Sequence, residues 1–309
     1  MGRALIPRLL ADGTERVVSV SRDEVKADAL AVDLAHTNLR VFLGDVRDQQ
    51  RLEQVFAGCD TVIHAAALKR VTSGYSPSEM IKTNIGGTIN VIQAAKEAGC
   101  SRVLFISSDK AVHATNLYGA TKFTAECYAV QSNSYTFPAG LRVSCTRYGN
   151  VLGSRGSVTE AWAAIPESDP LPITSSLMTR FMITRTQAVD FILQALEAMR
   201  GGEVFIPLLQ GFQVYDLMRA LYPERAIKHV GLRSGGEKLH ERLVSDEEWG
   251  RLYQTQWGTM ILPSFNTWGA PGAWAEHPLM LRSNEFRFHS DRAERLTVEQ
   301  LGEICRESL

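Results

Sequence analysis

Several features that mark specialised classes of protein are scarce in this sequence. Only five cysteines occur in 309 residues, and no two of them form a C-x-x-C pair. An odd number of widely spaced cysteines favours free thiols in a reducing compartment over disulfides or a metal site. No run of about 18 apolar residues is present, which argues against a membrane-spanning helix. The first residues also lack the apolar stretch of a secretory signal, so we expect a cytoplasmic protein.

The sequence also has almost no excess of positive or negative charge. Lysine and arginine total 33, aspartate and glutamate total 34, and the formal net charge is −1. A chain without a strong field of one sign is not expected to bind nucleic acid or an anionic membrane surface. The seven histidines, among them His113 and His240, show no metal-ligand spacing, so we expect no metal site.

Apolar residues, by contrast, are plentiful. Hydrophobic residues make up 45% of the chain and charged residues 22%, close to the averages for globular proteins. This supply is enough for a large core, which excludes intrinsic disorder and a disulfide-stapled miniprotein. The length indicates one large domain or two unequal ones.

Short β-branched runs alternate with amphipathic stretches through the first half of the chain. The predicted strands cover 16–20, 39–43, 60–64, 102–107 and 140–147, and the predicted helices cover 23–35, 48–57, 78–98 and 118–131. Such alternation is typical of an α/β fold, in which a doubly wound, Rossmann-like parallel sheet carries helices on both faces. Ligands of these sheets bind at the carboxyl ends of the strands.

The alternation ends near Asn150. We therefore predict a Rossmann-like, dinucleotide-binding domain over residues 1–150 and a smaller α+β substrate-binding region over 151–309, not strictly contiguous with one domain. The second region has prolines at 166, 170, 172 and 207, with helices predicted over 186–199, 215–221 and 297–306. Its stretch 257–274, rich in Trp, Gly and Pro, is predicted to be an irregular surface segment.

Tyr118 and Lys122 lie four residues apart on a predicted helix. Positions with this spacing share a helix face, so the ammonium group can lie near the phenol. A nearby cation stabilises phenolate and lowers a tyrosine pKa from about 10 towards neutrality. Such a tyrosine can accept a proton from a sugar or alcohol hydroxyl group as hydride leaves. The alternative is a chance pair on a surface helix.

A second candidate pair, Asp109 and Lys110, follows strand 102–107 in the run Ser107-Ser108-Asp109-Lys110. Strand ends present the reactive groups of a doubly wound sheet, so this acid and amine could divide proton donation and proton removal between them. For these roles the carboxyl group needs a raised pKa, and the amine must be held neutral by desolvation. The alternative is a solvated turn with a loose ion pair.

Further motifs occur in order along the chain. They are Ser21-Arg22-Asp23-Glu24, His64-Ala-Ala-Ala67-Leu-Lys69, Ile81-Lys-Thr-Asn84, Arg147-Tyr-Gly-Asn150-Val-Leu-Gly-Ser-Arg155-Gly-Ser157, Met178-Thr-Arg180-Phe181 and Glu237-Lys238-Leu-His-Glu241. Together with the two pairs above, they resemble the extended short-chain dehydrogenase/reductase family over essentially the whole chain. Within it, the sequence is similar to the 5-inverting UDP-N-acetylglucosamine 4,6-dehydratases of polysaccharide biosynthesis.

This resemblance implies a role for each member of the two pairs. Tyr118 resembles the catalytic tyrosine, and Lys122 resembles its partner, which also holds the nicotinamide ribose. Asp109 resembles the acid that protonates the departing 6-hydroxyl group, and Lys110 the base at C5. In the implied reaction, NADP takes hydride from C4 of the UDP-sugar, water leaves across C5 and C6, and hydride returns to C6 while C5 is reprotonated.

The choice of cofactor depends on Arg22. It follows strand 16–20, where an acidic residue would bind a ribose 2′-hydroxyl group and an arginine favours a 2′-phosphate. Ser21 and Lys26 support the choice of NADP, whereas Asp23 weakens it.

Asp45 ends the next strand and resembles the residue that contacts adenine; a helix-capping aspartate is the alternative. The remaining cofactor contacts implied by the resemblance are Ala65, Ala66 and Lys69.

The resemblance also implies a UDP-sugar as the partner and a homo-oligomeric enzyme. Its site would be formed by Lys69, Asn150, Arg155, Arg180 and Glu237. Arginine forks match pyrophosphate oxygens bidentately, although a surface ion pair is the alternative for any single arginine.

The start of the sequence departs from the family pattern. The family opens with an apolar strand and a glycine-rich turn that lays the cofactor pyrophosphate on a helix N-terminus. Here the run Met1-Gly2-Arg3-Ala4-Leu5-Ile6 matches the helix after that turn, and the first strand is absent. Three explanations stay open: a truncated start, a fold that binds NADP poorly or not at all, and a strand supplied by a partner chain.

Two other functions therefore stay open besides the dehydratase. One is a UDP-sugar 4-epimerase or a dehydratase of another UDP-sugar. The Asp109–Lys110 pair argues against simple epimerisation, which needs only Tyr118 and Lys122 for redox chemistry. The other is a catalytically silent homologue that binds UDP-sugar.

Overall fold

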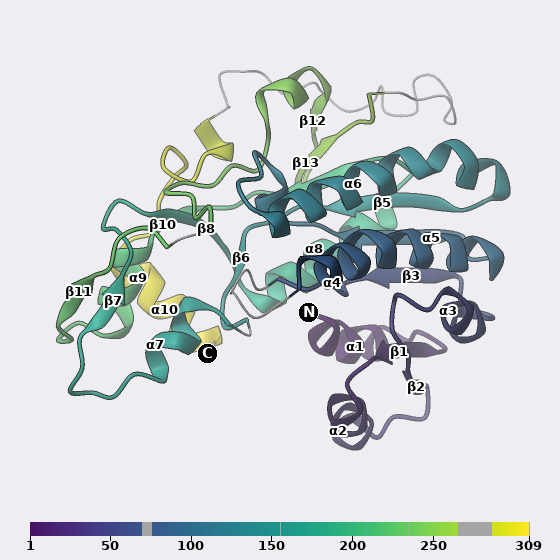
Figure 1. Ribbon diagram of the computed structural model, residues 1–309, viewed down its shortest axis with the longest axis horizontal. Helices are drawn as coiled ribbons and strands as arrows, with labels where there is room; N and C mark the ends of the chain where they lie inside the picture. Colours follow the sequence, from purple (N-terminus) through teal and green to yellow (C-terminus); the bar gives the residue numbers. More distant parts are fainter. Residues whose placement is uncertain (70–75, 155, 234, 265–285, 309) are drawn as a thin grey trace.

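A six-stranded sheet forms the centre of the molecule (Figure 1). The computed structural model describes residues 1–69, 76–154, 156–233, 235–264 and 286–308. Along the sheet the strands are β12 (Leu252–Gln254), β13 (Gly258–Ile261), β9 (Val204–Pro207), β5 (Arg142–Thr146), β4 (Arg102–Ile106) and β3 (Thr61–His64). The last four are parallel, and β13 and β12 add an antiparallel edge.

Strands β1 (Val17–Ser21) and β2 (Leu39–Leu43) form a separate parallel sheet. With helices α1 (Gly2–Ala11) and α2 (Glu24–Leu34) they make a unit that lies beside the β3 edge (Figure 1). The predicted α/β class and parallel strands are confirmed, but the expected single sheet consists of two.

Helices cover both faces of the central sheet, as predicted. On one face, α3 (Gln49–Phe56), α5 (Gly87–Glu97) and α6 (Leu117–Thr136) pack against Val103 and Phe105 of β4. The neighbouring residues Leu104 and Ile106 point to the opposite face, where α1 and α8 (Arg185–Ala198) lie, because side chains alternate along a strand.

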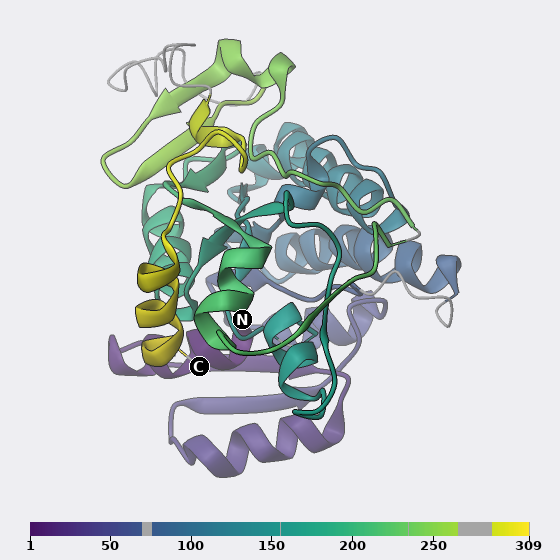
Figure 2. The ribbon, with the colours of Figure 1, turned by 90° about the vertical axis from the view of Figure 1, so that its left-hand side faces the viewer.

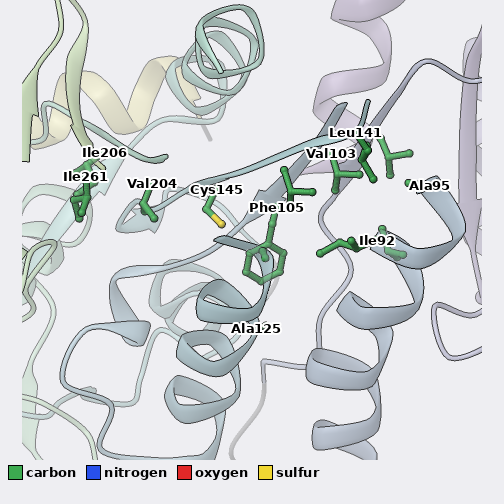
Figure 3. Packing of buried hydrophobic residues seen from close by; sticks show 14 of the residues in the cluster. Ile92, Ala95, Val103, Phe105, Ala125, Leu141, Cys145, Val204, Ile206 and Ile261 are labelled. Atoms are coloured by element: carbon green, nitrogen blue, oxygen red, sulfur yellow. The ribbon is translucent and has the colours of Figure 1, made fainter. Parts of the chain in front are cut away.

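Small residues allow the helices to lie close to the sheet. Figure 3 shows Ala95 of α5 and Ala125 of α6 in the layer with Val103 and Phe105. Both alanines are fully buried, so a larger side chain at either position would overpack this layer.

The predicted helix 78–98 is interrupted. It consists of α4 (Pro77–Ile81), a π-helical turn η1 (Lys82–Gly86) and α5. Such turns occur frequently at functional sites. Here the turn carries Asn84, a buried residue whose amide contacts the loop after β3.

A smaller lobe lies at one end of the sheet (Figure 2). It contains β6 (Asn150–Val151), β8 (Thr179–Ile183) and β10 (Gly211–Gln213) in one sheet, β7 (Leu171–Ile173) and β11 (Ile227–His229) in another, and helices α7 (Val158–Ala163), α9 (Val214–Leu221) and α10 (Val298–Ser308). Trp162, Leu217 and Leu301 belong to its core. The range 151–309 thus supplies this lobe and also β9, β12 and β13 of the central sheet.

The segment 257–274 was expected to be irregular. Its residues 258–261 instead form strand β13, which pairs with β9, and 265–274 lie outside the described residues. All five cysteines are free thiols, as predicted.

No helix in the part of the chain that the structure describes is long and apolar enough to cross a bilayer. Within the same residues, no group of three or more His, Cys, Asp or Glu side chains is arranged to hold a metal ion.

Candidate active site

The carboxyl ends of the parallel strands carry most of the predicted site residues. Ser21 ends β1, and Asp45 follows β2 in the same small sheet. Ala65 and Asp109 follow β3 and β4, which pair in parallel in the central sheet. Within each sheet, parallel pairing therefore brings these residues to one edge, where such folds bind their ligands.

Asp109 and Lys110 form an ion pair in the short turn η2 (Asp109–Ala111) after β4, with Asp109 buried and Lys110 partly buried. The Lys110 Nζ donates to both carboxylate oxygens of Asp109, at 3.0 and 2.9 Å. Ser108 caps this turn: its Oγ accepts from the Lys110 amide at 3.3 Å and donates to Asp109 Oδ1 at 2.9 Å. The Asp109 side chain is only 1% exposed. The alternative of a solvated turn with a loose ion pair is therefore wrong.

A second buried carboxylate, Glu241, contacts the same lysine. The Lys110 Nζ lies 3.0 Å from Glu241 Oε1. Glu241 also lies 3.1 Å from the Lys238 Nζ and 3.9 Å from the Arg180 Nε. Glu241 is not among the site residues predicted from the sequence. Its place in the motif Glu237-Lys238-Leu-His-Glu241 is the feature that points to it.

The two partners of this pair differ in how their pKa values move. Burial raises the pKa of Asp109, and the negative charge of Glu241 raises it further, against the opposing effect of Lys110. The raised pKa expected for an acid is confirmed. Burial alone would lower the pKa of Lys110, but Asp109 and Glu241 outweigh it and the pKa is raised. The expectation that desolvation holds Lys110 neutral is therefore wrong.

Tyr118 and Lys122 lie on the first turns of α6, as predicted. Burial raises the pKa of Tyr118, while Lys110 and a hydrogen bond with Ser108 lower it. The expected lowering by Lys122 is not found. Instead, the Lys122 Nζ donates to the Ile106 carbonyl at 2.5 Å and lies 4.0 Å from the centre of the Phe105 ring. Burial lowers the pKa of Lys122 to about 8.

Helix α6 approaches the acid–amine turn closely because residue 119 is glycine. A Cβ atom at this position would lie 2.4 Å from the Lys110 carbonyl oxygen. We expect Gly119→Ala to lower the free energy of unfolding by about 1–3 kcal/mol, the usual cost of overpacking. Urea unfolding measures this change. Gly250→Ala is the matched control, because a Cβ there meets nothing within 4 Å; equal losses in the two variants would contradict the argument.

Asn84 connects the loop after β3 to α6. Its side-chain oxygen accepts from the Leu68 amide at 2.7 Å, and its Nδ2 donates to the Leu68 carbonyl at 2.9 Å and to Thr121 Oγ1 at 3.0 Å. Beside Leu68, the predicted cofactor residues Ala65, Ala66 and Lys69 are exposed. The motif Ile81-Lys-Thr-Asn84 was noted in the sequence, but this contact was not predicted.

Arg22 and Asp45 face each other across the small sheet. The Arg22 Nη1 lies 3.9 Å from Asp45 Oδ2. Asp45 also binds the side chain of Arg47, which lowers its pKa. The alternative of a helix-capping role for Asp45 is wrong, because Asp48 caps α3 by accepting from the Arg51 amide.

Asp23 interacts with both Ser21 and Lys26. Ser21 Oγ accepts from the Asp23 amide at 3.2 Å. Asp23 caps α2 and forms an ion pair with Lys26. Lys26 is therefore turned towards Asp23, whereas Arg22 is turned towards Asp45.

The N-terminus of α1 has the properties of a phosphate-binding position. It has no side-chain cap, so its first N–H groups are not satisfied by a side chain. Arg185 and Lys69 lie close enough to act electrostatically on Met1, the residue that precedes this helix. Two cationic side chains thus act on a helix N-terminus, which fits a dinucleotide pyrophosphate.

The predicted substrate residues have different environments. Arg180 is buried, and its guanidinium donates to the Leu239 carbonyl at 3.0 Å and the Lys238 carbonyl at 2.9 Å. Arg180 therefore holds the segment 237–241. This role differs both from a surface ion pair and from the free guanidinium expected to bind a pyrophosphate. Glu237 pairs with Arg233. Asn150 is exposed at the start of β6, and Arg155 lies outside the described residues.

A parallel sheet with helices on both faces, an acid–amine turn after β4 and a tyrosine–lysine helix beside it define a short-chain dehydrogenase/reductase. Comparison with known families agrees. The model of the polysaccharide biosynthesis protein family matches residues 1–261, and the chain belongs to this family.

Three known proteins show how similar the chain is to individual members. It is 41% identical over 252 residues to a UDP-N-acetylglucosamine 4,6-dehydratase (inverting) of Campylobacter jejuni, covering 81% of this chain and 75% of that protein. It is 36% identical over 257 residues to a UDP-glucose 4-epimerase of Rickettsia typhi, covering 80% and 75%. The solved structure of Pen from Bacillus thuringiensis superposes with a TM-score of 0.89 at 29% identity, covering 99% of this chain and 94% of that one.

Proposed function

We propose that this chain is a nucleotide-sugar 4,6-dehydratase that converts UDP-N-acetylglucosamine to a UDP-4-keto-6-deoxy-hexosamine with inversion at C5. The observation that carries the proposal is the Asp109–Lys110 ion pair after β4, in which the carboxylate is buried. The 41% identity to an inverting dehydratase supports it. The net reaction removes one water: the C4 hydroxyl becomes a ketone and the C6 hydroxyl is lost.

Each side chain of the site has one proton to move. Tyr118 accepts the proton of the C4 hydroxyl as that carbon is oxidised. The resulting ketone acidifies the C5 proton, and the neutral amine of Lys110 accepts that proton. Asp109, whose pKa burial raises, donates its proton to the departing C6 hydroxyl group, which leaves as water. Once hydride has been added at C6, C5 takes up a proton on the face opposite to the one that lost it, which restores the C5–H bond and inverts that centre.

The redox part of this reaction requires a nicotinamide dinucleotide, which when bound supplies a hydride acceptor and donor. The N-terminus of α1 with Arg185 and Lys69 would hold its pyrophosphate, and Lys122 its nicotinamide ribose. Arg22 favours NADP over NAD, because its half-exposed guanidinium can pair with a 2′-phosphate. A cytoplasmic location and a homo-oligomer stay predictions from the sequence.

The second candidate function is a UDP-sugar 4-epimerase. The identity to a UDP-glucose 4-epimerase favours it. Epimerisation at C4 needs a proton acceptor such as Tyr118 but no acid at C6 and no base at C5. The Asp109–Lys110 pair would then have no role in the reaction. We therefore favour elimination.

Incubation of the purified protein with UDP-N-acetylglucosamine tests the proposal. Parallel samples receive NADP+, NAD+ or no added cofactor, and mass spectrometry follows the sugar nucleotide. We expect a product lighter by one water, formed faster with NADP+ than with NAD+. An epimer of unchanged mass would contradict the dehydratase, and binding of the sugar nucleotide without turnover would indicate a silent homologue.

A further inference from the structure

The ammonium group of Lys110 lies between two buried carboxylates from different parts of the chain. Asp109 is its neighbour in the turn after β4, at 2.9 and 3.0 Å. Glu241 reaches it at 3.0 Å from a segment 131 positions further along (241 minus 110). Both carboxylate side chains are almost fully buried, with 1% and 2% exposed. Water therefore screens neither charge effectively.

Two further cations, Lys238 and Arg180, favour the charged form of Glu241. The Lys238 Nζ lies 3.1 Å from Glu241 Oε2, and the Arg180 Nε lies 3.9 Å from Oε1. Burial alone would raise the pKa of Glu241, but Lys110, Arg180 and Lys238 outweigh it and the pKa is lowered. These three cations therefore favour the charged form of Glu241 against the effect of its burial.

The other ionisable groups around Lys110 come from three further elements. Tyr118 faces the pair from α6, and Arg180 approaches from β8. Glu237 lies 3.9 Å from Arg180 Nη2 and is paired with Arg233. Among these groups, Glu241 is the carboxylate that contacts Lys110 from outside the acid–amine turn.

We propose that Glu241 is a positioning residue of the dehydratase site. Its fixed negative charge favours the protonated forms of both Asp109 and Lys110. This inference rests on the proposed function. A negative charge beside two titrating groups makes each of them hold its proton to higher pH. Glu241 thus maintains Asp109 as the acid required at C6, and it makes the release of a proton from Lys110 the step that needs alkaline pH.

Glu241→Gln tests this charge while retaining the size of the side chain and an oxygen that accepts from Lys110. Both groups then release their protons more easily, so the whole pH–rate profile of dehydration is expected to move to lower pH by about one unit. Glu241→Asp keeps the charge, and its profile should keep the wild-type position even where kcat falls. A purely structural role would lower kcat in both variants without moving either profile.

Lys238→Met provides a variant with the opposite sign. It removes a cation beside Glu241, leaves the carboxylate to Lys110 and Arg180, and should move the profile to higher pH. This variant keeps the inference testable if Glu241→Gln does not fold. Profiles of Glu241→Gln and Lys238→Met that both stay at the wild-type position would overturn it.

A measurement without turnover separates this inference from the proposed function. NMR of protein carrying lysine labelled with carbon-13 at Cε follows the titration of Lys110, assigned by its loss in Lys110→Met. The midpoint should fall in Glu241→Gln. If the wild-type protein forms no dehydrated product but the midpoint falls, the proposed function fails and the effect of Glu241 on Lys110 stands. An unchanged midpoint contradicts the inference whatever the activity.

Discussion

Replacement of Arg147 by methionine is expected to lower the free energy of unfolding by about 3–5 kcal/mol. Arg147 is 1% exposed and sits between two carboxylates. Its guanidinium donates to Glu126 at 2.5 and 3.2 Å and to Glu248 at 2.7 and 2.9 Å. It also donates to the Leu243 carbonyl at 2.8 Å. Without the arginine, the buried Glu126 carboxylate and the Leu243 carbonyl lose this donor, and the partly buried Glu248 carboxylate keeps only the Ser245 amide.

The loss should depend on pH in a definite direction. Burial alone would raise the pKa of Glu248, but Arg147 outweighs it and the folded-state pKa is lowered. In the wild type, this contribution to stability is therefore present above the unfolded pKa and lost as pH falls through the folded one. In Arg147→Met, burial raises the pKa of Glu248 with no arginine to oppose it, so this carboxyl group binds a proton on folding and the variant gains stability as pH falls. The difference between the two proteins should shrink towards acid pH.

Urea unfolding at pH 8 and pH 5 measures both effects. Arg242→Met is the matched control, because Arg242 forms an exposed ion pair with Asp246 at 3.4 Å; its loss should stay below about 1 kcal/mol. If Arg147→Met does not fold at pH 8, the double variant Arg147→Met/Glu126→Gln removes one of the unpaired charges and should recover part of the stability. Equal losses for Arg147→Met and the control would refute the argument.

The sequence predicted the parts of the molecule that depend on local pattern. Alternating apolar runs identified β4 and the start of α6 to within one residue, whereas α6 continues to Thr136, beyond the predicted end at residue 131. Parallel strands present their carboxyl ends along one edge, so the sequence alone places the residues after β3 and β4 together. Asp109, Lys110 and Tyr118 follow from this reasoning and from family resemblance.

The sequence could not predict contacts between distant segments. Arg147 and Glu248 lie 101 positions apart and meet only through the tertiary fold. The same applies to Glu241, whose contact with Lys110 adds to the effect of Asp109 in raising the lysine pKa. A spacing of four residues put Tyr118 and Lys122 on adjacent helical turns, but it could not show that the Lys122 ammonium turns to the Ile106 carbonyl. Periodicity describes faces of elements and carries no information about which face meets which charge.

The prediction with the largest expected effect on activity is Lys110→Met. Loss of the base should slow elimination by about 10²–10⁴-fold, the range of general base catalysis, while oxidation at C4 stays measurable because Tyr118 is intact. Methionine fills the lysine site without its charge. Asp109 then faces Glu241 without the cation between them, which raises its pKa further and keeps it protonated as the acid. The variant therefore removes the base and leaves the acid in place.

Two signals measured in one reaction separate these steps. With UDP-N-acetylglucosamine in deuterium oxide, the wild type should incorporate deuterium at C5 and release water. Lys110→Met should show neither, yet the absorbance of the reduced nicotinamide should still rise, because oxidation at C4 precedes loss of the C5 proton. Lys82→Met, which alters an exposed lysine paired with Glu79 at 3.6 Å, should behave like the wild type. If Lys110→Met loses oxidation and exchange to the same extent, Lys110 acts before the C5 step, and the division of labour between Tyr118 and Lys110 is wrong.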